Sequence, residues 1–165
     1  MANSVDEGAD LAEIERLYRR RLPEFRRVAA AIVGSREQGR DVVQEAFATA
    51  VRKRASFRGE GPLEAWVWRI LVNAAREQRR ARIETPVDAP DLGVNGDHEA
   101  DADACVRVAL SLLPERQRLV VFMRYYADLD YRTIGKALDI EPGTVGVTLH
   151  NAHSRLQQLL EEVPR

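Results

Sequence analysis

The sequence is poor in the residues that build disulfides, metal sites and membrane spans. Cys105 is the only cysteine among 165 residues, so the chain can form neither an internal disulfide nor a cysteine-based zinc cluster. His150 and His153 share a helical face, but no nearby acidic residue completes a metal set with them. No apolar run approaches the roughly 20 residues of a membrane helix, and the acidic, polar start lacks the features of a secretory signal. We expect a cytoplasmic protein with no membrane insertion, no metal and no other cofactor.

Signals of catalysis are also scarce. The lone cysteine and the histidines show no spacing typical of a nucleophile with its base. The segment Gly59-Glu60-Gly61 is too short to be a phosphate-binding loop. We therefore expect a protein that is not an enzyme.

Charge is present in abundance but is unevenly distributed. The chain has 25 basic and 26 acidic residues, for a net charge of -1. Residues 84–104 hold seven acidic side chains, no basic one, two prolines and two glycines. This composition predicts an acidic flexible linker. The linker could be a simple spacer, or it could imitate nucleic acid inside a basic channel.

Apolar residues recur at helical spacing on both sides of the linker, and no stretch alternates like a strand. Pro23 is expected to kink or split the first helix. Ser35 and Gln38 suggest a capping box before the second helix, and Pro62 suits the start of the third. The pattern predicts an all-α fold: a disordered tail at 1–10, one small helical domain at 11–83, the linker at 84–104 and a second domain at 105–165.

A polar, basic stripe follows the third helix. It consists of Arg69, Asn73, Arg76 and Arg80 at spacings of four, three and four, flanked by Arg79 and Arg82. Arginines mixed with asparagine on one face suit phosphate contacts and groove reading, although a solvated helix end is the simpler alternative. Trp66 lies on the apolar stripe and is expected in the core. Trp68 lies off that stripe, so we expect it at a functional surface, where an aromatic ring can stack on unpaired bases.

The last two predicted helices, separated by a short turn, have the plan of a helix-turn-helix. The second of them places Thr144, Thr148, Asn151 and Arg155 on one outer stripe. Such a stripe can lie in a major groove, where Asn pairs with adenine and Arg with guanine. A plain helical hairpin with a solvated face is the alternative.

Three blocks, in this order, resemble the extracytoplasmic-function (ECF) sigma factors of bacterial RNA polymerase. The first is DVVQEAFATAVRK, residues 41–53, which resembles the helix that binds core polymerase. The second is FRGEGPLEAWVWRILVNAARE, residues 57–77, which resembles the promoter-melting helix. The third runs from Leu113 to Leu156 and resembles the C-terminal helix-turn-helix domain. The resemblance covers residues 11 to 162.

The resemblance implies roles for individual residues. The residues implied to bind the β′ clamp helices of core polymerase are Asp41, Gln44, Glu45 and Phe47. Those implied to capture, melt or contact the minus-ten element are Phe57, Arg58, Gly59, Trp68, Arg69, Asn73, Arg76, Arg79 and Arg80. Those implied to read the minus-thirty-five element, within helix-turn-helix 131–155, are Arg132, Thr144, Val147, Thr148, Asn151 and Arg155. The further partners implied are the β flap, promoter DNA and an anti-sigma factor.

The reading helix departs from the pattern of the family. Gly146, Thr148, Asn151 and His153 stand where Lys and Arg are usual. Fewer phosphate contacts predict weaker upstream binding, or a helix that reads bases more than phosphates. Two other functions stay open at this point: a free-standing helix-turn-helix regulator, and a protein-interaction adaptor that no longer binds DNA.

Overall fold

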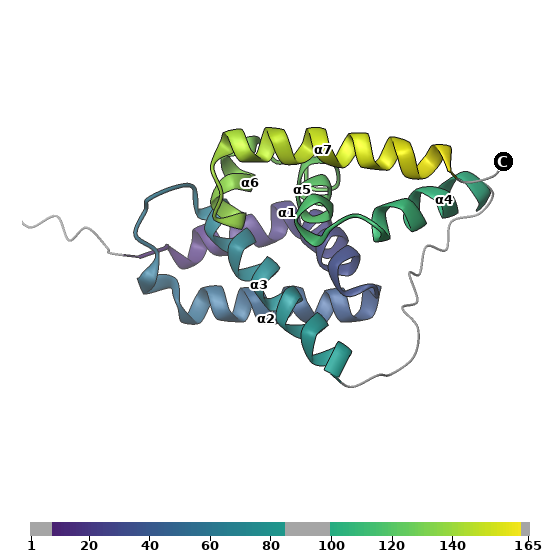
Figure 1. Ribbon diagram of the computed structural model, residues 1–165. Coiled ribbons are helices and arrows are strands. Elements are labelled where there is room, and N and C mark those ends of the chain that lie inside the picture. The colour runs from purple at the N-terminus through teal and green to yellow at the C-terminus, as the bar shows by residue number, and fades with distance from the viewer. Residues whose placement is uncertain (1–7, 85–99, 163–165) are drawn as a thin grey trace, which may run out of the picture.

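In a computed structural model, residues 8–84 and 100–162 are described, and they form helices joined by turns, with no strand among them (Figure 1). The elements are α1 (Leu11–Val33), α2 (Arg36–Arg52), the 3₁₀ helix η1 (Arg54–Ser56), α3 (Leu63–Glu84), α4 (Ala100–Ser111), α5 (Glu115–Tyr125), α6 (Tyr131–Leu138) and α7 (Pro142–Glu161). The predicted all-α class is confirmed.

Helices α1, α2 and α3 pack together as the N-terminal domain. Asp10 and Ser35 cap α1 and α2 through their side chains, as such residues do at helix starts. Pro23 lies inside α1, which is a single helix and is not split in two. Gly39 lets α1 and α2 cross closely, because a Cβ atom there would lie 2.7 Å from the backbone nitrogen of Ala30.

The C-terminal domain contains the expected helix-turn-helix. Asp130 caps α6, and Asp139 ends it in the left-handed conformation with φ of 58°. The turn is tight at Gly135, where a Cβ atom would lie 2.6 Å from the carbonyl oxygen of Ile140. Buried Ile134 and Val145 hold α6 against α7. These features fix the direction in which α7 leaves the turn.

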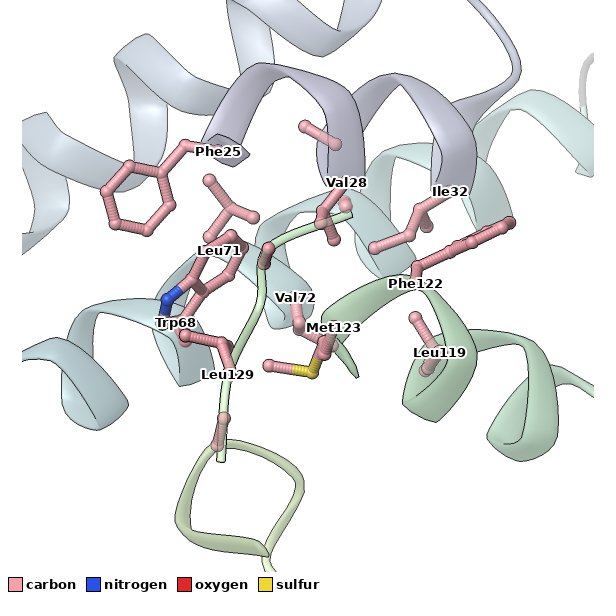
Figure 2. Close-up of a cluster of buried hydrophobic side chains, with 14 of the residues drawn as sticks. Phe25, Val28, Ile32, Trp68, Leu71, Val72, Leu119, Phe122, Met123 and Leu129 are labelled. Atoms are coloured by element: carbon pink, nitrogen blue, oxygen red, sulfur yellow. The ribbon is translucent and has the colours of Figure 1, made fainter. Parts of the chain in front are cut away.

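The two domains share one hydrophobic core. Figure 2 shows Phe122 beside Ile32, Met123 beside Val72 and Leu129 beside Trp68, each pair joining the C-terminal domain to the N-terminal domain. In Figure 1, α1 and α3 lie between α2 on one side and α5 to α7 on the other. The two expected helical domains are therefore present, and buried apolar surface joins them in a closed arrangement.

The observed domain limits differ slightly from the expected ones. Ala9 is buried and its N–H donates to the Arg54 carbonyl at 2.8 Å, so Ala9 packs with the N-terminal domain, although the tail was expected to run to residue 10. Helix α4 begins at Ala100, before the expected linker ends. The expected linker from 85 to 99 lies outside the described residues. Within the described part of the chain, no helix is both long and apolar enough to cross a bilayer.

Candidate nucleic-acid interface

The basic stripe lies along one side of α3, as expected. Arg69, Asn73 and Arg80 are exposed, and Arg76 and Arg79 are half-buried. A helix of this length presents residues at spacings of three and four on one face. The structure therefore brings these five predicted DNA contacts together.

Two arginines of this stripe are paired with carboxylates of the C-terminal domain. Arg69 Nη2 lies 3.0 Å from Asp139 Oδ1, and Arg76 Nε donates to Glu115 Oε1. Burial alone would raise the pKa of Glu115, but its hydrogen bond with Arg76 and the positive charges of nearby arginines lower it overall. The two carboxylates thus occupy positions where a phosphate group could sit.

Further polar contacts surround this domain boundary. Arg21 of α1 donates from Nη2 to the carbonyl oxygen of Ala127, and its Nε lies 2.9 Å from Glu64 Oε1. The Lys136 side chain of α6 lies 3.6 Å from the point where a Cβ atom of Gly61 would be. The C-terminal domain therefore covers part of α3 and the end of the loop before it.

The loop from Phe57 to Gly61 is held at one end and open in its middle. Phe57 is half-buried, with its ring centroid 5.5 Å from that of Trp66. Arg58 is exposed. Gly59 has a φ of +67°, which suits glycine, and no atom lies within 4 Å of where its Cβ would be. The middle of the loop is therefore free to contact a ligand.

The expectation for Trp68 is wrong. Its exposed fraction is 0%, and its ring lies 4.3 Å from that of Phe25 (Figure 2). Trp66, expected in the core, is only half-buried. The buried residues of α3 are Ala65, Val67, Trp68, Leu71, Val72 and Ala75, so its buried side is wider than a single apolar stripe and includes Trp68. Trp68 cannot stack on a base in this arrangement.

The residues predicted to contact polymerase divide into two groups. Asp41, Gln44 and Glu45 are exposed on α2. A hydrogen bond from Arg52 is the main reason that the pKa of Glu45 is lowered. Phe47 is 7% exposed and makes edge contacts with the rings of Tyr18 and Phe25. Phe47 therefore supports α2 from inside and is not part of its surface.

The outer face of α7 also differs by one position from the expected stripe. Thr144, Asn151 and Arg155 are exposed, as is Arg132 on α6. Thr148 is only 8% exposed, and its hydroxyl donates to the Thr144 carbonyl at 2.7 Å. Its place on the outer face is taken by Val147.

Several residues that shape these surfaces give no signal in the sequence. Asp139 and Glu115 pair with arginines that lie 70 and 39 positions away in the chain. The Tyr125 hydroxyl and His153 Nε2 are 2.8 Å apart at the side of α7. No periodicity reports such distant pairs, because periodicity describes only one helix at a time.

Comparisons with known proteins agree with this geometry. Residues 17–83 match Sigma-70 region 2, and residues 103–156 match Sigma-70 region 4. The RNA polymerase sigma-E factor of Streptomyces antibioticus is 30% identical over 156 residues, covering 92% of this chain and 87% of that protein. The ECF RNA polymerase sigma factor SigM of Mycobacterium tuberculosis is 29% identical over 156 residues, covering 93% of this chain and 80% of that protein.

Solved structures share the fold over almost the whole chain. The sigma factor RpoE in complex with the anti-sigma factor NepR from Bartonella quintana gives a TM-score of 0.74 at 22% identity, covering 93% of this chain and 100% of that one. The structure of CnrH in complex with the cytosolic domain of CnrY gives a TM-score of 0.72 at 21% identity, covering 94% of this chain and 92% of that one. With regions 2 and 4 both matched in order, the chain belongs to the Sigma-70 family, as a sigma factor of the ECF group.

Proposed function

We propose that this chain binds core RNA polymerase and directs it to promoters, using region 2 to open the minus-ten element and region 4 to read the minus-thirty-five element. The observation that carries this proposal is the separation of three exposed surfaces on one chain. They lie on α2, on the arginine stripe of α3, and on the outer face of α7. A free-standing regulator would need only the last of them.

The exposed face of α2 is the proposed polymerase contact. Asp41, Gln44 and Glu45 are exposed on α2, and α2 lies on the side of the N-terminal domain away from α5 to α7 (Figure 1). Two carboxylates and an amide on a rigid helix suit a basic partner surface. This contact is available in the closed arrangement.

The stripe of α3 and the loop before it are the proposed minus-ten contact. Asn73 and Arg80 are exposed and can meet the duplex directly. Arg58 and the open Gly59 can surround a base extruded from the duplex, which costs a few kcal/mol that loop contacts must offset. Arg69 and Arg76 would have to exchange Asp139 and Glu115 for phosphates, so DNA engagement requires the domains to separate here.

An anti-sigma factor is a further proposed partner. Both related solved structures are complexes with a second protein, and for the sigma factor RpoE that protein is named as the anti-sigma factor NepR. A protein that favours the closed arrangement would keep Arg69 and Arg76 paired internally. It would shift the population away from the form that binds DNA.

The decisive experiment is run-off transcription with core polymerase on a promoter library. We expect promoter-dependent products. We also expect the triple variant Asp41→Ala, Gln44→Ala, Glu45→Ala to lower the affinity for core polymerase at least about ten-fold, because it removes charged and polar contacts. Glu15→Ala, on the exposed side of α1, is the matched control and should leave core affinity unchanged.

Two results would contradict the proposal. One is the absence of any promoter-dependent product across the library. The other is tight, sequence-specific DNA binding by the chain alone together with no core binding, which would favour the free-standing regulator.

A further inference from the structure

The first half of α7 presents an unusually apolar outer face. Val147 is 62% exposed, the largest exposed fraction among the large apolar side chains of the described residues. Thr144 lies one turn before it and Asn151 one turn after it, both exposed. Because residues three and four apart share a helix face, these three side chains form one continuous strip. We refer to Thr144, Val147 and Asn151 as the reading strip.

The neighbouring Gly146 extends the apolar character of this face. A Cβ atom at Gly146 would lie 3.4 Å from Cε2 of Tyr131, an ordinary contact distance, so the tyrosine ring lies beside α7 at this glycine. Tyr131 itself is 44% exposed. The apolar surface at Val147 therefore continues toward the start of α6, which a Lys or Arg at position 146 would interrupt.

Charge is confined to the edges of the strip. From Gly143 to Ser154 the helix carries no Asp, Glu, Lys or Arg. Arg155 is exposed one turn beyond Asn151, and Arg132 is exposed on α6 next to Tyr131. Glu141 is also exposed, one turn before Thr144. A neutral strip with arginines outside it suits a groove floor of base edges flanked by phosphate backbones.

The chemistry of the strip selects among the bases. Guanine is read best by Arg or Lys at its O6 and N7, and the cytosine amino group by a carboxylate. The reading strip has neither. Asparagine pairs with adenine, and Val and the Thr methyl group contact the C5-methyl of thymine. Thr148 cannot contribute, since it is buried and its hydroxyl is bonded to Thr144.

We propose that α7 reads A·T pairs in the upstream promoter element, with Val147 and the Thr144 methyl group contacting thymine methyls and Asn151 pairing with adenine. This inference rests on the proposed function, because it assumes that α7 enters the major groove. It goes further in assigning the base chemistry and in making Val147 a determinant of specificity.

The test replaces each thymine of the upstream element by deoxyuridine, which removes only the methyl group. Promoters from the library selection are bound by holoenzyme, made of core polymerase and the full chain. We expect an affinity loss of about four-fold at each contacted thymine, the factor that one buried methyl group contributes. With Val147→Ala, holoenzyme should bind the thymine and deoxyuridine duplexes almost equally at the position that Val147 contacts. The Asn151→Ala variant should lose its preference for adenine at one position.

The controls separate this inference from the proposed function. Val108→Ala, an exposed valine on α4, should keep the full response to deoxyuridine. Equal binding of thymine and deoxyuridine by active holoenzyme, or a selected upstream element that is uniformly G·C, would overturn the inference and leave the proposed function intact. Loss of promoter-dependent initiation on every duplex, by contrast, would contradict the proposed function itself.

Discussion

At the scale of the residue, Trp68 packs from α3 against side chains of both domains. It contacts Phe25 of α1 and lies beside Leu129 of the C-terminal domain (Figure 2). Its Nε1 has no hydrogen-bond partner among the described residues, so packing alone holds the ring. Large side chains buried in this way contribute to stability through the contacts and volume that they fill.

Trp68→Ala should therefore act on stability. We expect a loss of about 3–5 kcal/mol in the free energy of unfolding, because the substitution leaves a large cavity. Trp66→Ala is the matched control and should cost less, since that ring is half-buried. Urea denaturation followed by far-UV circular dichroism measures both. A stable Trp68→Ala protein that had lost only promoter opening would return this residue to the surface role that the sequence suggested.

The error over Trp68 has a physical cause. The apolar residues of α3 cover more than half of the helix circumference, because one side faces α1 and α2 and another faces the C-terminal domain. Spacing alone supports either tryptophan as the buried one. The exposed arginines were easier to predict, since a charged side chain is rarely buried without a partner.

At the scale of the element, the start of α6 depends on a single carboxylate. Asp130 Oδ1 accepts the backbone N–H of Thr133 at 2.7 Å. That bond is the main reason that the pKa of Asp130 is lowered from its ordinary value of 3.8; burial opposes it and Arg132 adds to it. A depressed pKa in the folded state means that ionised Asp130 stabilises the fold above pH 3.8, and that this contribution disappears as the pH falls through the lower folded pKa.

Asp130→Ala should cost about 1 kcal/mol at pH 7, the usual value of such a cap. Asp130→Asn keeps an oxygen acceptor and should retain much of the cap, but it should remove the dependence on acid that this group causes. Urea denaturation of the three proteins between pH 7 and pH 3 tests both statements. If wild type and Asp130→Asn lost stability in parallel as the pH fell, another carboxylate would be responsible.

Helix ends were predicted better than helix faces. Ser35 caps α2 as predicted, and α3 begins at Leu63, directly after Pro62, because capping and the restricted backbone of proline act within a few residues. Pro23 was expected to kink or split α1, and the helix does not split. Packing of buried Phe25 and Val28 in the same turn and the next compensates for the backbone hydrogen bond that proline cannot make.

At the scale of the whole molecule, the ion pairs across the domain boundary are contacts whose removal can shift the closed arrangement without unfolding the protein. Arg69 and Arg76 and their acidic partners are partly exposed, and such pairs contribute about 0–1 kcal/mol each. The shared apolar core contributes more, because Phe122, Met123 and Leu129 are nearly fully buried. Removing the charges should therefore loosen the closed form without unfolding it.

The double variant Glu115→Gln, Asp139→Asn frees both arginines. We expect its affinity for forked minus-ten DNA to rise up to about five-fold, with a change in unfolding free energy of less than about 2 kcal/mol for the two pairs together. Fluorescence anisotropy with labelled DNA measures the affinity, and Glu13→Gln, exposed on α1, is the matched control. Unchanged affinity would mean that these carboxylates do not compete with DNA.

Each domain could be anticipated from the sequence, but their docking could not. The three helices of region 2 and the helix-turn-helix follow from local periodicity and caps. The closed arrangement depends on contacts such as Arg69 with Asp139, 70 residues apart, and on Met123 packing near Val72. Neither leaves a repeating signal within a single helix.

The shared core has a consequence for biosynthesis. A ribosome releases α1, α2 and α3 before it has made α5, so the nascent N-terminal segment leaves the exit tunnel with Ile32 and Val72 lacking their later neighbours. Those apolar side chains remain exposed to solvent until the last sixty or so residues have been translated, which takes about 3–12 s at ordinary elongation rates. During that interval the nascent chain presents chaperones with an apolar surface that is covered in the complete protein.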